Sequence, residues 1–483
     1  MAPKQSIYVG RESEHADFRQ LLKKRKSSLV TCQGRRRIGK STFIRKCSEE
    51  MDHFISIDGL APRKGLGKTE QLNSFSLKLS QQSRLPPVGI ATWSQAFQLL
   101  ASAIPSDGRT LVLLDEISWM ATGDADFAGH LKSAWDQEFS QQDGLVLFLC
   151  GSVSSWIEEN ILNSTGFVGR CSWQFNLDAL PLWCCNAFWP TARRQATAAE
   201  KLKILSITGG VPRYLEEIDP GQGAEQNIQR LCFNPSGLLF NEFEQIFHDI
   251  FGAKATTHRI ILEQLASGPK SVSQIGDDLG TKRGGSLSIR LKELEQARFI
   301  ARDVSFNPST GTDLPRIIRY RLSDNYMRFY LKYVAPHRSQ IEKKLYRHVP
   351  LESMQAWNSL IGLQFENLVL NNITGLLAQM GLSNTPILNA GPHYQTQTKA
   401  HESCQIDLML RSKETLYVFE VKFRKRINIS VADDLTEKIS RLKLPRSVSV
   451  RSGLIYQGEL DASLVNTDRI DFLLPFEQLL RKP

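Results

Sequence analysis

Residues Gly34–Ser41 read Gly-Arg-Arg-Arg-Ile-Gly-Lys-Ser, the spacing of a phosphate-binding loop. Glycines let backbone N–H groups curl around phosphate oxygens, and the N-terminus of a following helix adds partial positive charge. In such a loop the lysine neutralises the β- and γ-phosphates, and the serine coordinates Mg²⁺. We therefore predict that ATP and Mg²⁺ bind here, and that the contacts come from Gly34, Arg35, Arg36, Arg37, Ile38, Gly39, Lys40, Ser41 and Thr42.

Further along the chain, the apolar run 110–114 ends in Asp115-Glu116. We expect Asp115 to hold Mg²⁺ through water and Glu116 to polarise the attacking water. Such a pair alone is often only a solvated strand end, but the upstream phosphate-binding loop favours a catalytic pair. Ser152 follows the next apolar run, where it is either a γ-phosphate sensor or a turn serine. Arg170 is either an arginine finger or one half of a structural ion pair.

A second set of charged residues lies near the C-terminus. Asp407 falls in one predicted strand, and Glu420 and Lys422 share one face of the next. Two carboxylates can bind Mg²⁺, and a lysine can orient water or stabilise developing charge on a phosphate. Glu366, on the preceding predicted helix, would complete the site. The simpler alternative is a solvated hairpin with an ion pair.

Residues 256–322 read as three short helices followed by two strands, with a polar tip at 307–315. This pattern resembles a winged helix, with 286–297 as the recognition helix. Basic residues would grip DNA phosphates around the start of that helix; they are Lys282, Arg283, Arg290 and Lys292. Winged helices also serve as protein-binding modules or as part of an ATPase lid, so these alternatives stay open.

Hydrophobic periodicity predicts an α/β multidomain chain. Its parts would be a core with a parallel sheet (1–177), a helical part (178–255), a winged helix-turn-helix (256–335) and a C-terminal α/β domain (336–483). The resemblances described below imply that the first, second and last of these are a P-loop ATPase core, a helical lid and a nuclease-like domain. Near-continuous apolar strands separated by helices indicate a parallel sheet covered on both faces.

The composition narrows the class of protein. A net charge of +10 and a pI of about 9.1 favour polyanionic partners such as DNA. The eight cysteines form no Cys-x-x-Cys pair and lie mostly in apolar runs, which predicts reduced thiols and no zinc site. Neither a signal peptide nor a long apolar span is visible, so we expect a cytoplasmic protein without a membrane segment.

Several segments together resemble a known family. They are Tyr-Val-Gly-Arg-Glu at 8–12, Leu-Asp-Glu-Ile at 114–117, Cys-Gly-Ser at 150–152 and Thr-Gly-Gly-Val-Pro-Arg-Tyr-Leu at 208–215. The chain resembles archaeal and bacterial P-loop ATPases close to the STAND and origin-recognition-type AAA+ proteins. The resemblance implies that Val9, Gly10 and Arg11 lie near the adenine and that Pro212, in the lid, touches the nucleotide.

The C-terminal part resembles the PD-(D/E)xK nuclease-like (DUF234-type) domain that is fused to this ATPase family. The resemblance rests on the order of helix Glu366, strand Asp407, then Glu420-Val421-Lys422, followed by a helix and a strand. One departure is that no proline precedes Asp407.

The expected function is an ATP-driven, DNA-associated switch that controls a Mg²⁺-dependent nuclease-like domain. One alternative is a non-cleaving regulator whose winged helix and C-terminal domain only bind nucleic acid or protein. Another is an ATPase that acts on proteins. Because arginine fingers often act between subunits, Arg170 also suggests a homo-oligomer. The sequence identifies no protein partner.

Overall fold

The computed structural model describes residues 7–63, 65–152, 155–189, 196–280, 285–346, 349–397, 402–442 and 444–483. The chain forms two compact units, which we call the N-terminal unit (10–178) and the C-terminal unit (179–483). Val9 is grouped with the C-terminal unit, and Gln296–Arg298 with the N-terminal unit. The finer domain limits at 255/256 and 335/336 stay predictions.

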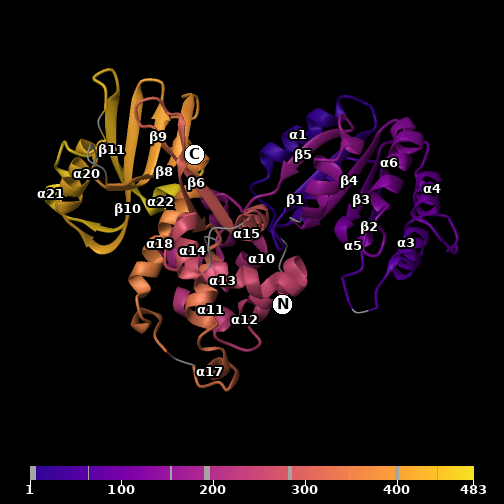
Figure 1. Ribbon diagram of the computed structural model, residues 1–483, viewed down its shortest axis with the longest axis horizontal. Coiled ribbons are helices and arrows are strands. Elements are labelled where there is room, and N and C mark those ends of the chain that lie inside the picture. The colour runs from indigo at the N-terminus through magenta and orange to yellow at the C-terminus, as the bar shows by residue number, and fades with distance from the viewer. Residues whose placement is uncertain are drawn as a thin grey trace. The chain divides into compact units, whose positions relative to one another are not determined.

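The N-terminal unit is built around a parallel sheet with the strand order β2-β3-β4-β1-β5. The strands are β1 (Ser28–Gly34), β2 (His53–Asp58), β3 (Thr110–Asp115), β4 (Leu145–Ser152) and β5 (Cys171–Asn176) (Figure 1). Four of them lie where the apolar runs predicted strands. The edge strand β5 was not predicted, because its residues alternate between half-buried and exposed and form no apolar run.

Helices cover both faces of this sheet. Residues of α3 (Lys68–Gln82), α4 (Trp93–Ala103) and α6 (Phe127–Gln137) share one buried cluster with the strands. The other face is covered by α1 (Glu12–Leu22) and α2 (Lys40–Ser48), whose phenylalanines contact those of β4 and β5. Because both faces are buried, the sequence shows continuous apolar strands, and the predicted α/β class is confirmed.

The C-terminal unit contains a mixed sheet with the order β12-β11-β10-β9-β8. Its strands are β8 (Ile387–Gln395), β9 (Cys404–Ser412), β10 (Thr415–Ile427), β11 (Ser449–Leu460) and β12 (Phe472–Pro475). On one face α18 (Trp357–Leu370) packs its Phe365 against the strands, and α20 (Ser430–Ser440) packs on the other (Figure 1). The pairs β8–β9 and β9–β10 are antiparallel, whereas β10–β11 and β11–β12 are parallel.

After residue 178 the chain is helical, with the short α8 (Leu182–Cys185) followed by α9 (Ala198–Thr208), α10 (Pro212–Leu215), α11 (Ala224–Cys232) and α12 (Leu238–Phe251). Leu202 and Leu205 of α9 and Leu215 of α10 belong to the same buried cluster as Phe365 and Phe419. The helical segment that the sequence predicted as a lid therefore shares its hydrophobic core with the C-terminal sheet.

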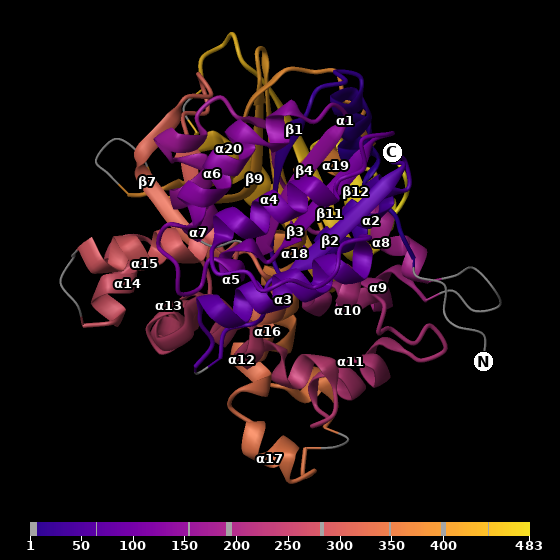
Figure 2. The ribbon, with the colours of Figure 1, turned by 90° about the vertical axis from the view of Figure 1, so that its right-hand side faces the viewer.

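Next come α13 (Ala255–Leu265), α14 (Val272–Asp278) and α15 (Gly285–Gln296), then the antiparallel pair β6 (Ile300–Phe306) and β7 (Asp313–Leu322) (Figure 2). The tip of this hairpin is fixed to the C-terminal sheet. Buried Arg411 donates to the Ser309 carbonyl at 2.9 Å, and Asn389 donates to the Gly311 carbonyl at 3.0 Å. Because Phe306 is also buried among residues of β9 and β10, the hairpin packs as an extension of that sheet.

Seven of the eight cysteines are buried, Cys171 is half-buried, and all eight are free thiols. This agrees with the reduced cysteines that the sequence predicted. Within the described residues, no helix has both the length and the apolar character needed to cross a membrane.

The Gly209-Gly210 pair between α9 and α10 is required by backbone geometry. Gly209 has φ +55°, a left-handed conformation that favours glycine. A Cβ on Gly210 would overlap the backbone carbonyl of Leu180, and the Leu180 N–H donates to the Gly210 carbonyl at 2.7 Å. This close approach ties the start of the C-terminal unit to the turn before Pro212.

We predict that Gly210→Ala destabilises the protein by about 1–3 kcal/mol, because backbone must move to admit the methyl group. Gly362→Ala is the control, since a Cβ there meets nothing within 4 Å and lies inside α18. That control should be neutral or stabilise by up to about 1 kcal/mol. Urea unfolding followed by circular dichroism measures both, and equal midpoints for the two variants would contradict the prediction.

Candidate functional site

The predicted phosphate-binding loop lies between β1 and α2. Gly34 ends the strand, Gly39 precedes the helix with φ +92°, and Arg37 also has a left-handed φ of +70°. A Cβ at Gly34 would lie 2.7 Å from the Leu177 carbonyl oxygen, so glycine is needed there for packing. The N-terminus of α2 has no side-chain cap, which leaves its N–H groups available for phosphate oxygens.

Lys40 and Ser41, at the start of α2, are placed for nucleotide chemistry. The Lys40 ammonium donates to the Gly34 carbonyl at 2.8 Å and to the Arg35 carbonyl at 3.3 Å, so it lies over the loop. The Ser41 hydroxyl donates to Oδ2 of Asp115 at 2.6 Å, across 74 positions of the sequence. Oδ1 of Asp115 accepts the Glu116 N–H at 3.0 Å.

Strand order explains how these groups meet. Parallel strands bring their carboxyl ends to one edge of the sheet, and β4 separates β1 from β3. Gly34 is therefore paired in register with Ser152, and Asp115 with Asp58. Glu116 follows Asp115 in a left-handed conformation, φ +49°, at the beginning of α5 (Ile117–Met120). The backbone places Ser152 beside the loop, in the position expected of a phosphate sensor.

This edge of the sheet fits a magnesium nucleotide. The Ser41 hydroxyl and the Asp115 carboxylate are hard oxygen donors of the kind Mg²⁺ prefers, and they already lie within hydrogen-bonding distance of each other. Lys40 and the uncapped helix N-terminus supply the positive charge that phosphates need.

Arg11 contacts the backbone of the phosphate-binding loop. Its guanidinium is 5% exposed and donates to the carbonyls of Asp178 at 2.8 Å and Ile38 at 3.3 Å, and it pairs with Glu14. These contacts hold the backbone of the loop. The resemblance implied a place near the adenine for Val9, Gly10 and Arg11, and that contact stays a prediction.

Arg170 forms a two-pronged ion pair with Asp136 of α6, with N–O distances of 2.7 and 2.9 Å. The guanidinium, together with Lys132, lowers the pKa of Asp136 to about 2. In this structure Arg170 therefore makes the structural ion pair that was weighed against an arginine finger. Within the loop, Arg36 lies over the Trp119 ring at 5.9 Å. Pro212 begins α10 in the C-terminal unit, and its contact with nucleotide stays a prediction.

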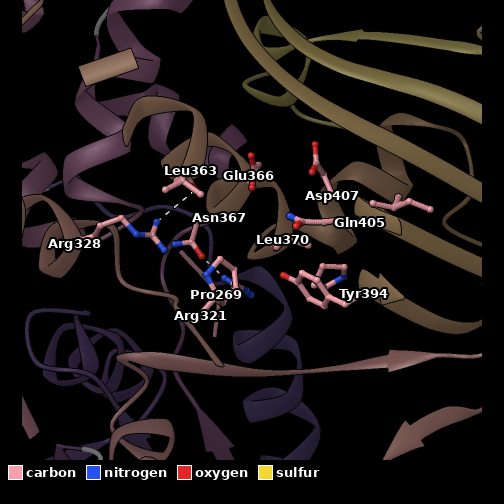
Figure 3. A pocket seen from close by; sticks show the side chains of 12 residues that line it. Pro269, Arg321, Arg328, Leu363, Glu366, Asn367, Leu370, Tyr394, Gln405 and Asp407 are labelled. Atoms are coloured by element: carbon pink, nitrogen blue, oxygen red, sulfur yellow. Dashed lines mark hydrogen bonds between the residues drawn. The ribbon is translucent and has the colours of Figure 1, made fainter. Parts of the chain in front are cut away.

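In the C-terminal unit, the structure brings the four predicted site residues together. Glu366 lies on α18, Asp407 on β9, and Glu420 and Lys422 on β10. Oδ2 of Asp407 accepts the Val421 N–H at 2.8 Å and lies 3.5 Å from the Lys422 ammonium. Glu366 and Asp407 line one small pocket between α18 and the sheet (Figure 3).

The same pocket is lined by polar side chains that the sequence did not single out. Arg321 of β7 and Arg328 of α16 (Asn325–Phe329) lie on one side, and Tyr394 and Gln405 on the other (Figure 3). Arg328 is fully buried and donates to Oε1 of Gln364 at 2.6 Å and to the Leu322 carbonyl at 3.0 Å. No spacing in the sequence links these arginines to the carboxylates, because they precede the sheet in the chain.

Glu420 is only 1% exposed, and each of its oxygens binds a lysine. Lys422 contacts Oε2 at 2.5 Å, and Lys438 of α20 contacts Oε1. Two ammonium groups compensate the desolvation of this buried carboxylate. Lys438 thus completes the set of charges around Glu420.

The electrostatics of the pocket follow from burial. Burial, and then the nearby Asp407 carboxylate, raise the pKa of Glu366 to about 8. Burial alone would lower the pKa of Lys422, but Asp407 and Glu420 outweigh it and raise that pKa. At neutral pH the Glu366 carboxyl group in the pocket is thus protonated, and the ionised Lys422 lies 3.5 Å from Asp407, which also lines the pocket.

A metal at this second site does not fit as well as one at the first. Among the described residues, no group of three or more His, Cys, Asp or Glu side chains is arranged to hold a metal ion. Glu420 has both oxygens occupied by lysines, although carboxylates are the donors that Mg²⁺ prefers. We derive no metal-dependent step here.

The structure describes two of the four residues that the sequence predicts to contact DNA. Lys282 and Arg283 lie outside the described residues. Arg290 is half-buried and Lys292 is exposed, both on α15.

Two parts of the chain match known protein families. Residues 8–218 match the family described as an ATPase domain predominantly from Archaea, and residues 330–438 match a family of archaeal and bacterial proteins of unknown function. An uncharacterized protein of Methanocaldococcus jannaschii is 24% identical over 369 residues, which is 74% of this chain and 76% of that protein.

Among solved structures, a Walker-type ATPase of Pyrococcus abyssi has a TM-score of 0.51 and 17% identity. The match covers 68% of this chain and 97% of that chain. This likeness supports the fold, and with the family matches it confirms the archaeal-type P-loop ATPase and the DUF234-type C-terminal domain.

We predict that Glu366→Gln flattens the pH dependence of stability between about pH 4.5 and 8. The raised pKa means that folding favours the protonated carboxyl group, so its contribution is full below pH 4.5 and lost as the pH rises through 8. Relative to wild type, the variant should gain roughly 4 kcal/mol at pH 9 over pH 5, because each unit of pKa difference between the folded and unfolded states is worth about 1.4 kcal/mol.

Urea midpoints at pH 5, 7 and 9 measure this effect. Glu414→Gln, at an exposed position in the β9–β10 turn, is the matched control and should follow the wild-type profile. If Glu366→Gln also follows that profile, Glu366 is not protonated in the folded protein at neutral pH.

Proposed function

Because this chain carries an archaeal-type P-loop ATPase domain joined to a DUF234-type domain, we propose that it is an ATP-dependent protein whose C-terminal unit acts on DNA. The contact that carries the ATP assignment is the 2.6 Å hydrogen bond from Ser41 to Asp115, because it joins the loop to the acidic strand end. Mg²⁺ would be held there, with Lys40 on the phosphates and Glu116 acting on the attacking water.

For the C-terminal unit we propose a phosphodiester site at Glu366, Asp407 and Lys422, in a nuclease-like domain. The proposal is supported by three observations: Glu366 and Asp407 line one pocket, Lys422 lies 3.5 Å from Asp407, and Arg321 and Arg328 bring positive charge to the same pocket. An ionised lysine next to a carboxylate can bind a phosphate oxygen and hold a water molecule near it. The exposed basic run 424–426 would attract the phosphate backbone of the nucleic acid.

The winged-helix assignment of 256–322 is part of the proposal. The order α13, α14, α15, β6, β7 is that of a winged helix, and Lys292 is exposed on the third helix. Since the hairpin tip is fixed to the C-terminal sheet, DNA contact would come from α15 rather than from the tip.

A second function, a regulator that binds DNA without cleaving it, is favoured by one observation. Both oxygens of Glu420 are occupied by Lys422 and Lys438, so cleavage that needs Glu420 as a metal ligand would first require these lysines to move.

For the ATPase, we predict that Lys40→Ala abolishes ATP binding, because the phosphates lose their main cation. Glu116→Gln should still bind ATP but hydrolyse it roughly 10²-fold more slowly, because a general base contributes about that much or more. Isothermal titration and phosphate release measure the two effects. Lys46→Ala, an exposed lysine on the same helix, is the control and should behave as wild type. Normal hydrolysis by Lys40→Ala would overturn the loop assignment.

For the second site, we predict that Asp407→Ala and Lys422→Ala each abolish cleavage of labelled DNA, assayed with Mg²⁺ or Mn²⁺, with and without ATP. Lys413→Ala, in the exposed β9–β10 turn, should cleave like wild type. Cleavage that persists in both site variants would show that the site lies elsewhere. If the wild-type protein cleaves no DNA or RNA with either metal, the non-cleaving regulator is the better description.

A further inference from the structure

A second, larger pocket lies beside the proposed phosphodiester site. It has a volume of about 310 Å³ and opens between the β6–β7 hairpin and β8. Leu314 and Ile317 of the hairpin provide apolar surface, Tyr394 and His393 of β8 provide rings, and Asn307 provides an amide. Its size is within the range of small-molecule sites. The two elements that form it, the hairpin and β8, are about 80 residues apart in the sequence.

The lining of this pocket is uncharged. Among the described residues that line it, none is Asp, Glu, Lys or Arg. His393 is 2% exposed, and burial lowers its pKa to about 4, so its ring is neutral at physiological pH. Neither ring nitrogen makes a well-formed hydrogen bond within the described chain. A neutral, partly aromatic pocket with a buried ring nitrogen to satisfy suits a polar heterocycle better than a phosphate or a lipid chain.

Tyr394 connects the two pockets. Tyr394 lines both this pocket and the one that contains Glu366 and Asp407, and Figure 3 shows its side chain in the second of these. The ring is held in place, because the Tyr394 N–H donates to the Ser305 hydroxyl at 3.0 Å and the Arg319 guanidinium lies over the ring at 4.7 Å. A ligand in the larger pocket would therefore be one side chain away from the carboxylates.

We propose that this pocket binds an unpaired nucleobase of the strand whose phosphate lies at Glu366 and Asp407. The inference rests on the proposed phosphodiester site and specifies its substrate. The separation by a single aromatic ring matches the short reach between a phosphate and the base of its own nucleotide. A base inside a duplex cannot enter such a pocket without leaving the stack, so the preferred substrate is single-stranded or locally unpaired nucleic acid.

The test measures binding in EDTA, so that cleavage plays no part, and without added nucleotide, whose base would compete for the pocket. The probe is a single-stranded DNA oligonucleotide with one 2-aminopurine, whose fluorescence changes when the base moves from the stack into a protein pocket. Ile317→Trp fills the pocket and should weaken binding on the order of ten- to a hundredfold, as expected for the loss of one bound base. Leu314→Trp is a second filling variant, and it guards against misfolding of the first.

Ile318→Trp is the matched control, because successive strand residues point to opposite faces and Ile318 does not line the pocket. It should bind the oligonucleotide like wild type, and all three variants should keep wild-type ATP hydrolysis. Equal affinities of Ile317→Trp, Leu314→Trp and wild type would overturn the proposal. So would binding of a fully paired duplex as tightly as the single strand.

Free 2-aminopurine riboside separates two sources of the base. If it binds as tightly as the oligonucleotide, the pocket holds a free nucleoside or nucleotide and the assignment to a nucleic-acid strand fails. The outcome is also distinguishable from that of the cleavage assay. If Asp407→Ala loses cleavage and Ile317→Trp binds like wild type, the base pocket is rejected and the phosphodiester site is kept. If Ile317→Trp weakens binding and Asp407→Ala still cleaves, the phosphodiester site is rejected and the base pocket is kept.

Discussion

Glu420 is a carboxylate almost fully removed from water, and two lysines from different elements bind its two oxygens. A buried charge without partners would cost several kcal/mol, so the arrangement of β10 and α20 depends on this pairing. Because Lys422 also reaches Asp407, the same requirement determines where the other acidic side chain of the site lies. The residues predicted to be catalytic thus also neutralise one another's charges inside the sheet.

Similar compensation holds the elements around this site together. Arg328 is buried between α16 and α18, where carbonyl and amide oxygens accept hydrogen bonds from its guanidinium. Arg321 of β7 pairs with Asp303 at 2.9 Å and donates to Asn367 of α18. These contacts position α18, and therefore Glu366, relative to the hairpin. Through these contacts, a movement of the hairpin would also move α18 and its Glu366. Regulation of the site would need a physical connection of this kind.

The N-terminal unit uses a different device. Its functional groups meet at the carboxyl ends of parallel strands, where the loop, Asp115 and Ser152 follow three neighbouring strands. Lys40 is buried, but backbone carbonyls of the loop accept hydrogen bonds from its ammonium, and Ser41 donates to Asp115 at the strand end. This arrangement is ready for a nucleotide, whereas the lysines on Glu420 would have to rearrange before that carboxylate could bind a cation.

The sequence by itself determined the nucleotide site and most of the N-terminal fold. The reason is local: a loop of eight residues contains its own glycines, lysine and serine, and continuous apolar strands reveal a doubly covered sheet. The edge strand β5 was missed because half-exposed alternation resembles a loop. The acidic residues of the C-terminal site were also visible, since Asp407 and Glu420-Val421-Lys422 lie on consecutive strands.

Only the tertiary structure decided which residues surround that acidic site. Arg321, Arg328 and Tyr394 come from three separate segments, and their meeting depends on how the hairpin and α16 pack on the sheet. The predicted lid and the C-terminal sheet share one buried cluster, and the winged-helix hairpin packs its Phe306 against β9 and β10. Within the N-terminal unit, tertiary packing pairs Arg170 with Asp136. Spacing along a chain contains no information on such contacts, because they join side chains of different elements that are brought together by burial of apolar surface.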